Sequence, residues 1–128
     1  MKLIERIKTL IINLVHHSSA ESAPNVNYSE YIVRKIGHNY HHLSSLFSST
    51  ENITIEKYII LQKIERVKEL LVYNELTLSE IAFQMGYSSV QHLSTQFKKV
   101  TGFTPSYFKT IKENKRKPLD KVKETALH

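Results

Sequence analysis

Apolar residues recur at helical spacing along almost the whole chain. Isoleucine, leucine and valine return every three or four positions, and no segment shows the strict alternation that is typical of a half-buried strand. The pattern therefore predicts an all-α fold, with helices at about residues 3–17, 29–36, 40–49, 55–73, 78–85, 89–99 and 105–113.

Short polar residues and glycines mark the ends of these helices. Thr77 is followed three residues later by Glu80, which is the pattern of a capping box. Thr104 precedes Pro105, a residue that favours the first helical position. Further helix starts are predicted at Thr54 and at Ser88 or Ser89, and turns with a positive φ at Gly37, Gly86 and Gly102.

The apolar skeleton of the chain occurs twice. Ile32, Ile36 and Gly37 match Ile81, Met85 and Gly86 at a separation of 49 residues, whereas Leu43, Phe47, Thr54 and Tyr58 match Leu93, Phe97, Thr104 and Phe108 at a separation of 50. One extra residue therefore enters the turn of the second copy. The repeat predicts two helix-turn-helix units, at about residues 28–54 and 77–104, joined by a long central helix at 55–74.

The length of the central helix suits a DNA-binding connector. Its 19 residues, 55–73, would span about 28 Å at a rise of about 1.5 Å per residue. Successive major grooves on one face of B-DNA are about 34 Å apart, so a rigid connector of this length could place two helices one turn apart. Lys63 and Arg66 on this helix, with Gln62, are candidate phosphate contacts; the alternative is that they are ordinary surface groups.

A polar stripe faces away from the predicted core on the last helix of the second unit. Leu93, Phe97 and Val100 share one face, which leaves Gln91, Ser94, Thr95 and Lys98 on the other, with His92 beside them. Amide, hydroxyl and ammonium groups suit base edges and phosphates. Ser88 and Ser89 begin this helix, where backbone N–H groups can bind a phosphate oxygen. The alternative is a solvated face without a ligand.

The corresponding stripe of the first unit has different chemistry. It consists of His41, Ser44, Ser45 and Ser48, and it contains no lysine, arginine or glutamine. Short hydroxyl groups reach bases poorly and neutralise no phosphates. The first unit is therefore expected to add less affinity and less specificity than the second.

The positive charge of the chain is unevenly placed. The 128 residues carry a net charge of +6. Residues 1–97 are balanced, with nine Lys/Arg and nine Glu, so the whole excess lies in residues 98–128. Residues 112–128 are highly charged with few apolar residues, which predicts a basic, disordered tail. Such tails bind nucleic acid, acidic lipid or no particular partner.

Residues 3–15 are more apolar than a free terminal helix should be. They either pack on the core of this domain, or contact a second subunit or an upstream regulatory domain. Glu5, Arg6 and Lys8 interrupt the apolar run, which argues against a secretion signal and favours a cytoplasmic protein without a membrane partner. Residues 1–24 are interpreted as this extra helix and a linker, with the linker at 18–25.

The sequence contains no recognisable motif for catalysis or metal binding. It contains no cysteine, which excludes thiolate chemistry and cysteine-ligated zinc. His38, His41 and His42 are close in sequence, and a metal site would need a pair of them at helical spacing together with a carboxylate or another histidine. The sequence indicates no such partner for the pair. With no glycine-rich phosphate loop and no Ser/His/Asp ordering, neither an enzyme nor a cofactor is expected.

Residues 64–109 resemble a known family, the AraC/XylS-type transcriptional regulators. The resemblance is carried by Glu-Ile-Ala at 80–82, Gly-Tyr-Ser at 86–88, His-x-Ser-x-x-Phe-Lys at 92–98 and Gly-x-Thr-Pro-Ser-x-Phe at 102–108. With the weaker first unit it covers residues from about 27 to 109, and the DNA-binding domain is predicted at 25–111. Such regulators use two helix-turn-helix subdomains, joined by a long helix, to bind adjacent major-groove segments of double-stranded DNA.

Carried over by position, the resemblance implies particular DNA contacts. Base contacts fall on Val90, Gln91, His92, Ser94 and Thr95 in the second unit and on Tyr40, His41, Ser44 and Ser45 in the first, and Lys98 falls on a phosphate contact. The chain departs from the family pattern where Ser44 and Ser45 replace longer side chains, where Val33 replaces a small residue and where Asn52 replaces glycine.

The sequence therefore predicts sequence-specific binding of double-stranded DNA and transcriptional regulation, with the second unit dominant in base reading. The alternative is a helical interaction module that binds RNA polymerase or a partner subunit, with weak non-specific DNA binding. The uncharged stripe of the first unit and the apolar residues 3–15 favour this alternative.

Overall fold

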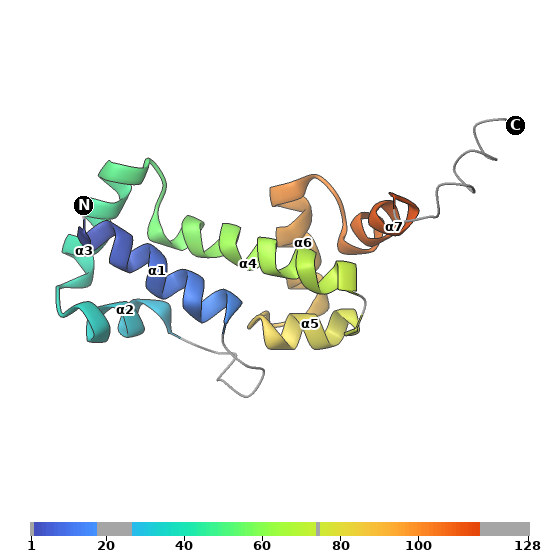
Figure 1. The fold of residues 1–128 in the computed structure, drawn as a ribbon, viewed down its shortest axis with the longest axis horizontal. Helices are drawn as coiled ribbons and strands as arrows, with labels where there is room; N and C mark the ends of the chain where they lie inside the picture. The colour runs from blue at the N-terminus through green and yellow to red at the C-terminus, as the bar shows by residue number, and fades with distance from the viewer. Residues whose placement is uncertain (1, 18–26, 74, 116–128) are drawn as a thin grey trace, which may run out of the picture.

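The computed structural model describes residues 2–17, 27–73 and 75–115, which form seven helices and no strand. The helices are α1 (Lys2–His16), α2 (Tyr28–Ile36), α3 (Tyr40–Glu51), α4 (Ile55–Tyr73), α5 (Leu78–Gln84), α6 (Val90–Thr101) and α7 (Pro105–Lys115), as Figure 1 shows. The all-α prediction is confirmed, and every predicted helix boundary lies within two residues of the observed one.

Two predicted segments fall partly or wholly beyond this description. The predicted linker at 18–25 and the part of the basic tail after residue 115 lie outside the described residues. The first four residues of the predicted tail, 112–115, instead continue α7. Ile111 is half-buried there, and the Lys112 ammonium lies 5.4 Å from the centroid of the Phe108 ring. Packing on the domain thus extends the helix beyond the boundary that composition suggested.

The central helix α4 is the axis of the molecule. It packs against α1, α3, α5, α6 and α7 (Figure 1). Its buried residues are distributed along its whole length: Ile55, Ile59, Ile64, Val67 and Leu71. Burial of each such side chain stabilises the fold by about 1.5–3 kcal/mol. These residues belong to the same core cluster as the buried residues of both units, so α4 joins the two units into one hydrophobic core.

Helix α1 is part of this core. Its buried stripe is formed by Ile4, Ile7, Ile11 and Val15, and α1 packs more extensively against α4 than against any other helix. Lys8 forms a 2.6 Å salt bridge with Glu51 at the end of α3, and a ring nitrogen of His16 lies 2.8 Å from Gln62 Oε1 on α4. The structure thus answers the question raised by residues 3–15: their apolar face is covered by their own domain.

The two units repeat in three dimensions as well as in sequence. The rings of Phe47 and Tyr58 meet edge to face with centroids 5.5 Å apart, and Phe97 and Phe108 do the same at the same separation. Helix starts also correspond, because the hydroxyls of Thr54 and Thr104 accept hydrogen bonds from the N–H groups of Lys57 and Tyr107. The predicted capping box of Thr77 and Glu80 is present.

The predicted turns have the predicted backbone conformation. Gly37, Gly86 and Gly102 have φ values of 85°, 79° and 86°. At the end of α3, Asn52 takes the place of Gly102 with a φ of 64°, a conformation that asparagine tolerates better than most residues. The second turn is one residue longer than the first, as predicted, since two residues separate Gly37 from α3 and three separate Gly86 from α6.

The packing of α1 can be tested by an Ile7→Ala substitution. Ile7 is fully buried, so the truncation should leave a cavity and lower the free energy of unfolding by about 2–5 kcal/mol, measured by urea or thermal denaturation. Asn13→Ala, at an exposed position of the same helix, is the control and should change stability little. Equal stability of the two variants would contradict the described packing of α1.

Candidate nucleic-acid interface

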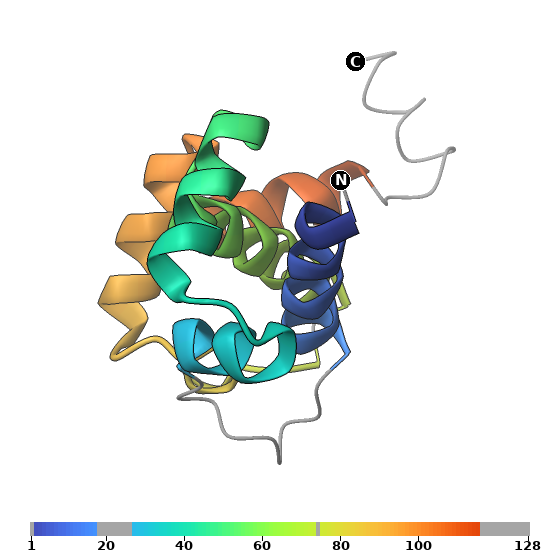
Figure 2. The ribbon, with the colours of Figure 1, turned by 90° about the vertical axis from the view of Figure 1, so that its left-hand side faces the viewer.

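The second helices of the two units, α3 and α6, lie on one side of α4. Figure 2, which looks roughly along α4, shows them running in the same general direction, with α1 on the other side of α4. The parallel arrangement follows from the repeat, because each unit attaches its second helix to the shared core through equivalent buried residues. Two helices presented in this way can approach a single surface together.

The polar stripe of α6 lies opposite its buried face, as predicted. Leu93 and Phe97 are fully buried. Gln91, His92, Thr95 and Lys98 are exposed, whereas Val90 and Ser94 are half-buried. Packing of the two large apolar residues therefore fixes the rotation of the helix about its own axis. That rotation turns amide, hydroxyl, imidazole and ammonium groups outward along one side.

The start of α6 is held by the residues that precede it. The Ser89 hydroxyl caps the helix by accepting a 3.0 Å hydrogen bond from the His92 N–H. The Ser88 N–H donates to His92 Nδ1 across 3.4 Å, and the Ser88 hydroxyl lies 3.1 Å from the same nitrogen. Both serines are exposed. The structure thus brings Ser88, Ser89 and His92 together, although the sequence did not indicate contacts among them.

Tyr87 packs beneath the surface formed by Ser88, Ser89 and His92. It is only 7% exposed, and its hydroxyl donates a 2.6 Å hydrogen bond to Gln96 Oε1. Its ring meets that of His92 edge to face, with centroids 5.0 Å apart, and burial raises the pKa of its hydroxyl. The sequence analysis missed this role. The only available signal was the presence of Tyr87 in the Gly-Tyr-Ser turn, which does not reveal what the ring contacts.

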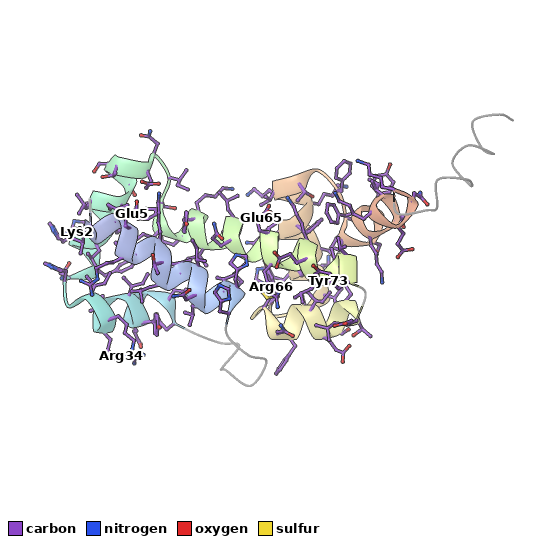
Figure 3. All side chains as sticks on the ribbon, viewed as in Figure 1. Lys2, Glu5, Arg34, Glu65, Arg66 and Tyr73 are labelled. Atoms are coloured by element: carbon purple, nitrogen blue, oxygen red, sulfur yellow. The ribbon has the colours of Figure 1, made fainter. Side chains whose placement is uncertain are left out.

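The candidate phosphate contacts on α4 are engaged within the protein. The Lys63 ammonium lies 4.5 Å from the centroid of the Tyr87 ring, and burial lowers the pKa of Lys63. Arg66, labelled on α4 in Figure 3, is half-buried and forms a 3.0 Å salt bridge with Glu69. The predicted phosphate contacts of Lys63 and Arg66 remain predictions, and a phosphate would have to bind beside the present partner of each side chain or replace it.

The stripe of α3 repeats the geometry of α6 with weaker chemistry. Leu43 and Phe47 are fully buried, His41 and Ser45 are exposed, and Ser44 and Ser48 are half-buried. Tyr40 is half-buried at the helix start, and its hydroxyl donates to a carboxylate oxygen of Glu56 on α4. Desolvation and this hydrogen bond raise the pKa of Tyr40. Tyr40 therefore ties α3 to α4.

Helices α6 and α7 are more positively charged than α3. They carry Lys98, Lys99, Lys109, Lys112 and Lys115 against a single acidic residue, Glu113. Helix α3 carries Glu51 and no lysine or arginine. Of the two polar stripes, that of α6 would therefore attract an anionic partner more strongly.

Within residues 2–17, 27–73 and 75–115, no three His, Cys, Asp or Glu side chains converge in a way that could hold a metal ion. No helix in the same ranges combines the length and the apolar character needed to cross a membrane.

Known proteins share this fold. At 22% identity the chain superposes on the C-terminal domain of AraT, a response regulator from Geobacillus stearothermophilus, with a TM-score of 0.74 over 87% of this chain and 86% of that one. It also superposes on the DNA-binding domain of AdpA, solved in complex with a target DNA, with a TM-score of 0.70 and 14% identity over 88% of this chain and 95% of that one. These likenesses establish the fold.

Sequence comparison identifies relatives and a family. The chain is 28% identical over 111 residues to the Msm operon regulatory protein of Streptococcus mutans, a match that covers 87% of this chain and 37% of that protein. The chain spans between 14% and 43% of the length of the first curated relatives that it matches. A family model described as a helix-turn-helix domain matches residues 32–110. The chain belongs to the AraC-type helix-turn-helix family of transcriptional regulators.

Proposed function

We propose that the chain is the DNA-binding part of a transcriptional regulator and that α6 carries most of its base recognition. The observation that carries the proposal is the outward polar stripe of α6, on a helix whose rotation is fixed by buried Leu93 and Phe97. Gln91 can pair with adenine N6 and N7, and Thr95 can bond to several base edges. Val90, His92 and Ser94 complete the base-contacting set, and Lys98 neutralises a phosphate.

The first unit plays a smaller part in this proposal. Helix α3 presents His41, Ser44 and Ser45, with Tyr40 held against α4 at its start. These short side chains can position the protein on the DNA backbone, but they offer little bidentate base recognition. The first unit therefore contributes register and contact area, and the second contributes specificity and most of the attraction to phosphates.

The alternative of a helical interaction module has less support. One of the two sequence features that favour it is the apolar face of residues 3–15, and that face is buried against α4, α2 and α3. Contacts with RNA polymerase, with a second copy or with an upstream regulatory domain would have to use other surfaces. A DNA partner also agrees with the cytoplasmic location that the sequence favours, and regulation rather than catalysis agrees with the relatives.

Base recognition by α6 can be tested with Gln91→Ala and Thr95→Ala. After selection of a preferred site from random DNA, each variant should lose about 1–3 kcal/mol of discrimination between that site and single-base variants. Binding titrations with the two kinds of DNA measure this difference. Unchanged discrimination by the Gln91→Ala protein would show that the α6 stripe does not read bases.

The proposed phosphate contact of Lys98 predicts a different signature. Lys98→Ala should weaken binding to all sequences about equally and reduce the slope of log K against log salt concentration by about one. Binding measured over a range of salt concentrations gives this slope. Lys2→Ala is the control, because Lys2 lies at the first-unit end of the molecule, away from α6 (Figure 3). If both variants had the same slope, Lys98 would make no special phosphate contact.

The division of labour between the units can be tested by footprinting. A monomer should protect two major-groove segments about one helical turn apart on one face of the DNA. Base substitutions in the segment bound by α6 should cost more affinity than substitutions in the segment bound by α3, because α3 lacks amide and basic side chains. Protection of only one segment would show that the first unit does not engage the DNA.

A further inference from the structure

The side chain of His92 is held in place by neighbouring residues of the protein itself. The Tyr87 ring lies against its imidazole, and the Ser89 hydroxyl accepts a hydrogen bond from its backbone N–H. The Ser88 N–H donates to its Nδ1 atom, and the Ser88 hydroxyl approaches the same atom. The imidazole is nevertheless exposed. It is therefore an oriented group on the surface of the first turn of α6.

The contact with Ser88 determines which ring nitrogen carries the proton. A backbone N–H can only donate, so His92 Nδ1 must accept and cannot carry a hydrogen while this contact is made. In a neutral imidazole the hydrogen then resides on Nε2. The Ser88 hydroxyl can rotate to donate to Nδ1 as well. His92 thus offers one polar atom to a ligand, an Nε2–H donor.

We propose that His92 is a specificity-determining residue that recognises a hydrogen-bond acceptor on DNA through Nε2–H. Base-edge acceptors in the major groove are purine N7, guanine O6 and thymine O4, and the backbone offers phosphate oxygens. The amino groups of adenine and cytosine are excluded as partners, because they only donate. The inference rests on the proposed DNA-binding function, and it specifies that one position of that interface donates a hydrogen bond.

Being a hydrogen-bond donor alone distinguishes His92 from the rest of the α6 stripe. Gln91, Ser94 and Thr95 each carry both a donor and an acceptor, so each can adapt to either kind of base edge. The corresponding residue of the first unit is His42, whose ring lies beside that of His38 with centroids 5.9 Å apart. At the same separation of 50 residues, His38 stands in the place of Ser88, so the first unit has no serine there. The fixed donor is a feature of the second unit.

The acceptor can be located with modified DNA. A site selected from random DNA is synthesised with base analogues that each lack one acceptor, and separately with single methylphosphonate linkages that replace phosphates. At one position the modification should weaken binding of the wild-type chain about fivefold, the loss of about one hydrogen bond. The same modification should not weaken the His92→Ala protein further. Coupling to a base analogue identifies a base edge, and coupling to a methylphosphonate identifies a phosphate.

Matched variants separate the donor from the bulk of the side chain. His92→Gln can place an amide N–H near the position of Nε2 and should retain part of the coupling, whereas the shorter His92→Asn should not. His17→Ala, at an exposed histidine at the end of α1, is the control and should show the wild-type coupling. If His92→Asn kept the full coupling, a donor at the Nε2 position would not be the cause.

The protonated nitrogen can also be observed without DNA. Nitrogen NMR of the free chain at a pH where histidine is neutral should show the Nε2–H form of His92, and the Nδ1–H form would overturn the inference. It would also be overturned if no modification coupled to His92 while Gln91→Ala still reduced discrimination, and in that case the DNA-binding proposal would stand. If the chain showed no sequence preference at any salt concentration, the proposed function and the inference would both fail.

Discussion

Burial of α4 against both units is the constraint on which the rest of the structure depends. A helix on the surface of a domain normally buries one stripe, but α4 has to serve two sets of neighbours along 19 residues. Its buried isoleucine, valine and leucine side chains run from Ile55 to Leu71. Because these contacts are hydrophobic and closely packed, they fix the separation of α3 and α6 along the axis of α4. Core packing therefore sets the spacing on which the proposed binding of two DNA grooves depends.

The same constraint allows the two units to differ in chemistry. Residues that build each unit are equivalent, as the edge-to-face pairs of Phe47 with Tyr58 and of Phe97 with Phe108 show. Residues that point outward do not contribute to the core, so they can change without loss of the fold. The same arrangement of buried residues therefore carries two different surfaces. One presents the serines of the α3 stripe, and the other presents the amide and ammonium groups of the α6 stripe. Unequal contributions to DNA binding are compatible with equal structural roles.

Local chemistry explains which features the sequence could predict. Helix boundaries, the capping box at Thr77, the positive φ values and the outward stripe of α6 depend on residues close together in the chain, and all were predicted. The place of the Lys63 ammonium over the Tyr87 ring depends on residues 24 positions apart in different elements. Periodicity carries no information about such a contact. The same reason applies to α1, whose apolar face could have been covered by this domain or by a partner.

The turn before α6 contains residues that hold the helix and residues that orient its surface side chains. The turn between Gly86 and α6 contains two serines with different contacts: Ser89 caps the helix and Ser88 contacts the imidazole of His92. In the first unit Asn39 provides the cap alone. Leu93 and Phe97 of α6 are buried just as Leu43 and Phe47 of α3 are, so the longer turn leaves the buried faces of the two helices equivalent. The hydrogen bond from Ser88 orients a surface side chain, and in the proposed DNA complex it would set what this position recognises without changing how the helix is held.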